Sequence, residues 1–253
     1  MKIEFKISLR SALALSCFLS SVGLVAAQTE IVKTNHWEPD IRAFETSEHT
    51  NPPPTNAVLF TGASNIRLWK NVAEAFPGHK IFNRGFGGAE MTDLVEFAGR
   101  IVVPYHPKIV IIYAGDNDLA GHKTPEQILT AFQAFAHEVH TALPETVIGC
   151  IAVKPSPSRA KLVPQVKETD KLLEAFCHTN ANTIYIDDLT PMLSASGGPR
   201  PEFFGKDGLH LNEQGRAIWI SLIRPVLDRY DPLKNQNGDT VSITEKKEHS
   251  KIP

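Results

Sequence analysis

The stretch Lys108-Ile109-Val110-Ile111-Ile112-Tyr113 is apolar at every position after its lysine. A short apolar run rich in β-branched residues is typical of a strand that is buried on both faces, as in a parallel sheet. A polar segment, Gly115-Asp116-Asn117-Asp118, follows the run almost at once. Residues 108–113 are therefore predicted to form the central strand of the domain.

Similar short apolar runs lie on both sides of this strand, and amphipathic segments separate them. The further predicted strands are Val58–Thr61, Lys80–Asn83, Val147–Val153 and Thr183–Ile186. The predicted helices are Asn65–Ala75, Met91–Val103, Thr124–Leu143, Val163–Cys177 and Asn212–Tyr230. Strands that alternate with helices in this way form a parallel sheet covered by helices on both faces. The sequence thus predicts an α/β domain with a five-stranded parallel sheet over residues 57–230.

The segments at the two ends of the chain lack this alternation of strands and helices. Residues 1–27 have a basic start, an apolar core over Ser11–Val25 and the small residues Ala26 and Ala27 before Gln28. This pattern is typical of a cleaved secretory signal peptide, with an uncleaved anchor as the alternative, so we expect a secreted or periplasmic protein. Residues 231–253 are polar and lack apolar periodicity, which favours a disordered tail.

Residues 28–56 form a polar lead-in between the signal peptide and the domain. Trp37, Ile41 and Phe44 recur in it at helical spacing, which indicates a short helix that packs on the domain. No other segment is apolar and long enough to span a bilayer after signal cleavage.

The charge and the cysteines exclude several classes of function. The net charge is −2 with no basic stripe, so neither a nucleic acid nor an anionic membrane surface is an expected partner. Cys150 and Cys177 both fall in apolar patterns and fit buried thiols, although a disulfide between them stays open. The sequence predicts no oligomeric state.

Polar residues follow the predicted strands at the edge where ligands gather in parallel sheets. Ser64 comes after the first strand, and Asp207 and His210 come beyond the fifth. A serine hydroxyl becomes a nucleophile when an imidazole takes its proton and a carboxylate orients that imidazole. We therefore assign Ser64 as the candidate nucleophile, His210 as the general base and acid, and Asp207 as the orienting residue.

Four blocks in this order resemble the SGNH (GDSL-like) hydrolases. They are Gly62-Ala63-Ser64, Asn83 with Gly88, Gly115-x-Asn117-Asp118, and Asp207-x-x-His210. The resemblance implies a three-layer α/β/α sandwich of flavodoxin-like type and ester hydrolysis without a metal or a cofactor. It also implies an oxyanion hole formed by the backbone N–H groups of Ser64 and Gly88 and the side chain of Asn117.

One position departs from the family pattern, and two neighbouring residues have open roles. The family's first block usually reads Gly-Asp-Ser, whereas Ala63 stands here before Ser64. The hydrogen bonds of that aspartate are absent, which bears on how Ser64 is held. Asn65 and Arg84 are candidate substrate-binding residues, and Arg84 alternatively braces the loops by pairing with a carboxylate.

Other site types fit the sequence less well. Ile66 stands where an α/β-hydrolase elbow needs its second glycine, and Glu90 where a dinucleotide fingerprint needs its third. Gln127 occupies the twelfth position of a calcium loop in place of glutamate. His137 and His140 share a helix face without a third ligand, so no metal site is predicted.

The sequence therefore predicts a secreted serine esterase that cleaves carboxylic esters through an acyl-enzyme. The resemblance favours short acyl groups, such as acetyl esters of a small molecule or a carbohydrate. Three alternatives remain: a lysophospholipase or lipase-like acylhydrolase, acyl transfer to a sugar acceptor, and a non-catalytic ligand-binding protein on the same fold.

Overall fold

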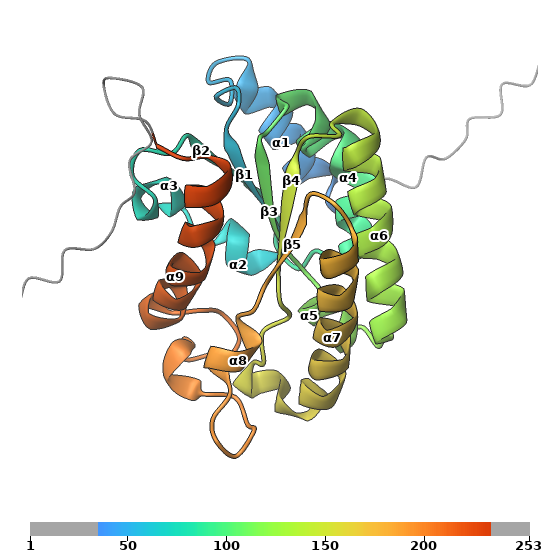
Figure 1. Ribbon diagram of the computed structural model, residues 1–253, viewed down its shortest axis with the longest axis vertical. Coiled ribbons are helices and arrows are strands. Elements are labelled where there is room, and N and C mark those ends of the chain that lie inside the picture. The colour runs from blue at the N-terminus through green and yellow to red at the C-terminus, as the bar shows by residue number, and fades with distance from the viewer. Residues whose placement is uncertain (1–34, 234–253) are drawn as a thin grey trace, which may run out of the picture. The chain divides into compact units, whose positions relative to one another are not determined.

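Five parallel strands pair in the order β2-β1-β3-β4-β5 in the computed structural model, which describes residues 35–233 (Figure 1). The strands are β1 (Val58–Gly62), β2 (Ile81–Gly85), β3 (Ile109–Tyr113), β4 (Val147–Ile151) and β5 (Thr183–Ile186). This order is the flavodoxin-like arrangement, and the predicted fold is confirmed. The predicted signal peptide, residues 28–34 of the lead-in and residues 234–253 of the tail lie outside the described residues.

The central strand is β3, as its apolar sequence predicts. It pairs with β1 on one side and β4 on the other, and all five of its residues are buried. Helices cover both faces of the sheet, with α4, α6 and α7 on one face and α9 beside α3 on the other (Figure 1). Such double coverage explains why β3 can be apolar at every position.

The longer helices begin where the sequence places their caps. They are α1 (Glu38–Glu48), α4 (Met91–Ile101), α6 (Pro125–Ala142), α7 (Val163–Thr179) and α9 (Glu213–Tyr230). Thr124 and Gln127 form a capping box at the start of α6, and the Asn212 side chain accepts the N–H of Gly215 at the start of α9. Among residues 35–233, no helix combines the length and the apolar character that crossing a membrane requires.

One predicted helix is wrong in its extent. Residues 65–75 form two short helices, α2 (Ser64–Arg67) and α3 (Val72–Ala75). The side chain of Asn83 donates to the carbonyl oxygens of Ile66 and Trp69 over 2.7 and 3.3 Å. The same carbonyls also accept the backbone N–H groups of Trp69 and Val72, three residues further on, so turns replace the four-residue spacing of a continuous α-helix here. The structure also adds two short helices that the sequence analysis lacks, α5 (Asp116–Ala120) and α8 (Leu189–Met192).

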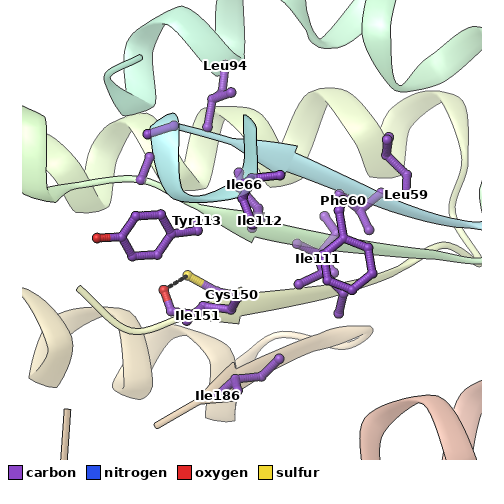
Figure 2. Close-up of a cluster of buried hydrophobic side chains, with 14 of the residues drawn as sticks. Leu59, Phe60, Ile66, Leu94, Ile111, Ile112, Tyr113, Cys150, Ile151 and Ile186 are labelled. Carbon is purple, nitrogen blue, oxygen red and sulfur yellow. Dashed lines mark hydrogen bonds between the residues drawn. The ribbon is translucent and has the colours of Figure 1, made fainter. Parts of the chain in front are cut away.

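Apolar side chains from the strands and helices fill the space on both faces of the sheet. Figure 2 shows part of this core, with Phe60, Ile112 and Cys150 among its buried residues. On the α9 face, Trp219 packs against Tyr113 at 5.0 Å between ring centroids. Cys150 and Cys177 are both buried free thiols, so the disulfide that the sequence left open is absent.

Candidate active site

Ser64 lies directly beyond the carboxyl end of β1. Gly62 has a φ of +135°, and a Cβ at this position would lie 2.0 Å from the carbonyl oxygen of Tyr113, so only glycine fits the turn. The N–H of Ala63 donates to that same carbonyl over 2.9 Å. These contacts with β3 hold the start of α2, where Ser64 is the first residue, against the edge of the sheet.

His210 and Asp207 reach Ser64 from a loop before α9. His210 Nε2 lies 2.9 Å from Ser64 Oγ, and His210 Nδ1 lies 2.6 Å from Asp207 Oδ2. Asp207 Oδ1 also accepts the backbone N–H groups of Leu209 and His210. These hydrogen bonds, first of all the one from His210, lower the pKa of Asp207 to about 2. The three side chains thus form one hydrogen-bonded chain that ends at a charged carboxylate.

Asn65 connects the two halves of this arrangement. Its Oδ1 accepts the backbone N–H of Leu211 over 2.9 Å, and the residue is only 5% exposed. Asn65 does not line the cleft that contains Ser64 and His210, and its predicted contact with substrate stays a prediction. Its side chain fastens the loop that carries His210 to α2, because the N–H of Leu211 needs a buried acceptor at this point.

Arg84 also lies away from the serine. Its guanidinium pairs with Glu48 Oε1 over 2.9 Å and packs within 5.1–5.3 Å of the rings of Phe44, Phe82 and Tyr105. Arg84 does not line the cleft that contains Ser64, and its predicted contact with substrate stays a prediction. The ion pair with Glu48 matches the alternative prediction, in which Arg84 pairs with a carboxylate. This pair joins β2 to α1.

All the remaining predicted residues except Asp207 line one cleft of about 430 Å³. Its lining includes Ser64, Gly88, Asn117 and His210, which are four of the residues assigned to the site. The other lining residues are Trp37, Asp40, Arg67, Gly87 and Leu209. Larger cavities elsewhere contain none of the assigned residues, since their walls lie around Pro107 and Leu143 and around Val95 and Ala131.

The cleft presents N–H donors close to the serine. The backbone N–H groups of Ser64 and Gly88 make no hydrogen bond to another backbone group of residues 35–233. Gly88 has a φ of +77°, a backbone conformation that glycine adopts more readily than other residues. One N–H of the Asn117 amide donates to the carbonyl of Ala89 over 3.0 Å. Because an amide NH₂ has two donors, a second N–H remains for a ligand oxygen.

A buried chain of charges holds the other end of the Asn117 amide. Arg159 Nη2 donates to Asn117 Oδ1 over 3.0 Å, and Arg159 Nη1 lies 3.1 Å from Asp116 Oδ2. Lys154, fully buried, pairs with the same Asp116 oxygen over 2.8 Å. Burial alone would raise the pKa of Asp116, but the charges of Lys154 and Arg159 outweigh it and lower the pKa.

Sequence reasoning missed Lys154 and Arg159 as site residues. The segment Lys154-Pro155-Ser156-Pro157-Ser158-Arg159 follows the predicted fourth strand and matches none of the four motif blocks. Its place beyond the carboxyl end of β4, at the same edge as Ser64, is the signal that could have found it.

No metal centre accompanies the cleft in the described part of the chain. Within residues 35–233, no three side chains of His, Cys, Asp or Glu come together in a way that could hold an ion. His140, one of the two histidines that share a helix face, lies 3.0 Å from the carbonyl of Thr146 through its Nε2.

Comparison with known proteins relates most of the chain to one family. Residues 55–218 match the model of the GDSL-like Lipase/Acylhydrolase family. No curated protein sequence matches the chain.

Solved structures share the fold at low sequence identity. An acylhydrolase from Bacteroides fragilis is 19% identical, with a TM-score of 0.67 over 78% of this chain and 98% of that one. A GDSL-like lipase from Bacteroides thetaiotaomicron is 20% identical, with a TM-score of 0.64 over 75% and 97%. A carbohydrate esterase family 3 protein from Talaromyces cellulolyticus is 17% identical, with a TM-score of 0.55 over 68% and 96%.

Proposed function

This chain belongs to the GDSL-like lipase/acylhydrolase family, and we propose on that premise that it is a serine esterase that hydrolyses carboxylic esters through an acyl-enzyme. The observation that carries the proposal is the chain of hydrogen bonds from Ser64 Oγ through His210 to Asp207, of 2.9 and 2.6 Å. An ordinary serine hydroxyl is a weak nucleophile, and such a chain is what activates it.

The residues supply each step of an acyl transfer. His210 Nε2 takes the proton of Ser64 as Oγ attacks the ester carbonyl carbon, and the carbonyl oxygen becomes negative. The N–H groups of Ser64, Gly88 and Asn117 stabilise that oxygen. The C–O bond then breaks, and His210 returns the proton to the leaving alcohol. A water molecule attacks the acyl-enzyme by the same route, which releases the acid and frees Ser64.

We further propose that the acyl group is short and that the alcohol part is a carbohydrate. Among residues 35–233, Trp37 and Leu209 are the only large apolar side chains that line the cleft. A long acyl chain needs more apolar surface than these two provide, since binding follows the apolar area removed from water. The fold likeness to a carbohydrate esterase is consistent with this choice.

A series of p-nitrophenyl esters from acetate to octanoate tests the acyl preference. We expect kcat/KM to be highest for acetate and to fall at least about tenfold by octanoate, because the cleft lacks an apolar extension. Acetylated xylan and a lysophospholipid test the alcohol part. A preference for octanoate together with the lysophospholipid would replace this proposal with the lipase-like alternative.

Export of the protein is a separate proposal, which rests on the sequence of residues 1–27. Expression of the full chain in a bacterial host, followed by N-terminal sequencing of the periplasmic product, tests it. We expect a mature chain that begins at Gln28, and recovery of the uncleaved chain in membranes would contradict this.

A further inference from the structure

Arg67 is the only lysine or arginine among the residues that line the cleft in the described part of the chain. It follows Ser64 by three positions in α2. Residues three apart on a helix are neighbours on its surface, so the guanidinium emerges on the same side as the nucleophile. A positive charge therefore stands beside the reacting hydroxyl.

The glycine turn after β2 makes room for this side chain. A Cβ on Gly87 would lie 2.7 Å from Arg67 Nε and 3.2 Å from Cζ, so a larger residue there would displace the guanidinium. A Cβ on the next residue, Gly88, would lie 3.3 Å from the Trp37 ring. Arg67 and Trp37 thus lie against the two glycines that border the proposed oxyanion hole.

The guanidinium of Arg67 makes no hydrogen bond or ion pair with any group of residues 35–233, and the residue is exposed. Buried and half-buried arginines of the same domain behave differently, since Arg84 pairs with Glu48 and Arg100 with Glu38 and Glu45. A guanidinium presents a planar set of donors that matches a carboxylate with two parallel hydrogen bonds. Arg67 therefore has its full donor set available to a ligand in the cleft.

The rest of the cleft wall narrows the class of ligand. Asp40 lines the same cleft, is exposed and forms no ion pair with Arg67. Its carboxylate repels a second anion but accepts hydroxyl groups. Trp37 is partly exposed and adds a flat apolar ring. A sugar ring that carries one carboxylate and several hydroxyls satisfies all three side chains.

We propose that Arg67 forms an anion subsite beside Ser64 and that the preferred substrate is a short-chain ester of a carboxylate-bearing carbohydrate. This inference rests on the proposed esterase function and adds the charge of its substrate. A phospholipid also carries an anion, but its long acyl chain has no matching apolar surface in this cleft.

Steady-state hydrolysis of acetylated polygalacturonate and acetylated glucomannan tests the subsite, with p-nitrophenyl acetate as an uncharged reference. We expect the wild type to prefer the acidic polymer by about tenfold in kcat/KM, which corresponds to about 1.4 kcal/mol. Arg67→Gln should remove most of that preference through KM, and Arg67→Lys should keep part of it. The preference should also shrink as salt is added, because the subsite is exposed.

Lys70→Gln is the matched control, because Lys70 is exposed and close in sequence but does not line the cleft. It should leave the preference unchanged. Equal hydrolysis of both polymers by the wild type, an equal loss on all three substrates in Arg67→Gln, or a preference for a lysophospholipid would each overturn the subsite. Absence of p-nitrophenyl acetate hydrolysis in the wild type would instead overturn the esterase function itself.

Discussion

Arg159 Nη2 donates a hydrogen bond to Asn117 Oδ1 over 3.0 Å, and this bond determines which way the Asn117 amide faces. With its oxygen held by Arg159, the amide directs its NH₂ group toward Ala89 and the cleft. Asp116 Oδ2 holds Arg159 in turn, and the fully buried Lys154 pairs with the same oxygen. Preorganised donors of this kind stabilise charge in a transition state without having to reorient during the reaction.

Arg159→Met should therefore lower kcat by about tenfold and leave KM nearly unchanged, because it loosens an oxyanion donor without touching the substrate. Asn117→Ala should cost on the order of 10²–10³ in kcat. The double variant should be no slower than Asn117→Ala alone, since Arg159 then has no amide to orient. Steady-state kinetics on p-nitrophenyl acetate measures all three.

Arg42→Met is the control for this double-variant cycle, since Arg42 is an exposed arginine in a surface ion pair on α1. It should change kcat by less than about twofold. Losses in Arg159→Met and Asn117→Ala that simply multiply in the double variant would show that Arg159 does not act through Asn117.

Asn65→Ala should destabilise the protein by about 1–3 kcal/mol, because the buried N–H of Leu211 loses its acceptor. It should also lower kcat, since the same bond fastens the loop that carries His210. Urea unfolding and kinetics measure the two effects. Asn71→Ala, at an exposed position, should stay within about 0.5 kcal/mol of the wild type, and equal effects of the two substitutions would contradict the role of Asn65.

The rate should rise with pH and then level off. The hydrogen bonds to Asp207 lower its pKa to about 2, so its carboxylate stays charged at every pH above about 4. The group whose protonation then controls the reaction is the imidazole of His210, which accepts a proton only when it is neutral. We expect kcat/KM to increase from acid pH and then to reach a plateau. A rate that stays flat from pH 4.5 to 9 would contradict the role of His210 as the general base.

The free energy of unfolding should decrease as pH rises, because Asp188 is buried. Burial raises its pKa to about 8, although Trp219 Nε1 donates to its Oδ2 over 2.6 Å. In the unfolded chain an aspartate loses its proton near pH 4. Between about pH 4 and 8 the folded protein therefore binds more protons than the unfolded chain, and the free energy of unfolding decreases with pH.

Asp188→Asn tests this stability prediction, because asparagine keeps the acceptor for Trp219 and cannot ionise. Urea unfolding at several pH values measures the free energy of unfolding of both proteins. The value for the variant minus that for the wild type should increase by about 1–3 kcal/mol from pH 5 to 8. Parallel curves for the two proteins would show that Asp188 does not stay protonated in the fold.

The strands and the four motif blocks could be predicted from the sequence because each depends on local pattern. An all-apolar run such as residues 109–112 has few alternatives to a buried strand, and Ser64 and His210 stand in motifs whose order is informative. The identity of the partners of Asn65, Arg84 and Asn83 could not be predicted in this way. Their partners Leu211, Glu48 and Ile66 lie 146, 36 and 17 residues away in the sequence.

The contacts that orient the Asn117 amide could not be predicted from the sequence either. The block Gly115-x-Asn117-Asp118 predicts an oxyanion donor at Asn117, but nothing in that block indicates which group orients its amide. Only the packing of β3 beside β4 brings Arg159 within 3.0 Å of Asn117. Polar networks that join several loops therefore need the tertiary structure, even where every loop is recognised.

Labelling with a fluorophosphonate probe, followed by peptide mass spectrometry, tests the central claim most directly. We predict a single modified residue, Ser64, in the wild type, because only a serine paired with an imidazole is nucleophilic enough to react. Ser64→Ala should take up no probe and should lose p-nitrophenyl acetate hydrolysis while keeping the wild-type unfolding curve. A wild type that stays unlabelled, or a Ser64→Ala variant that still turns over, would contradict the account.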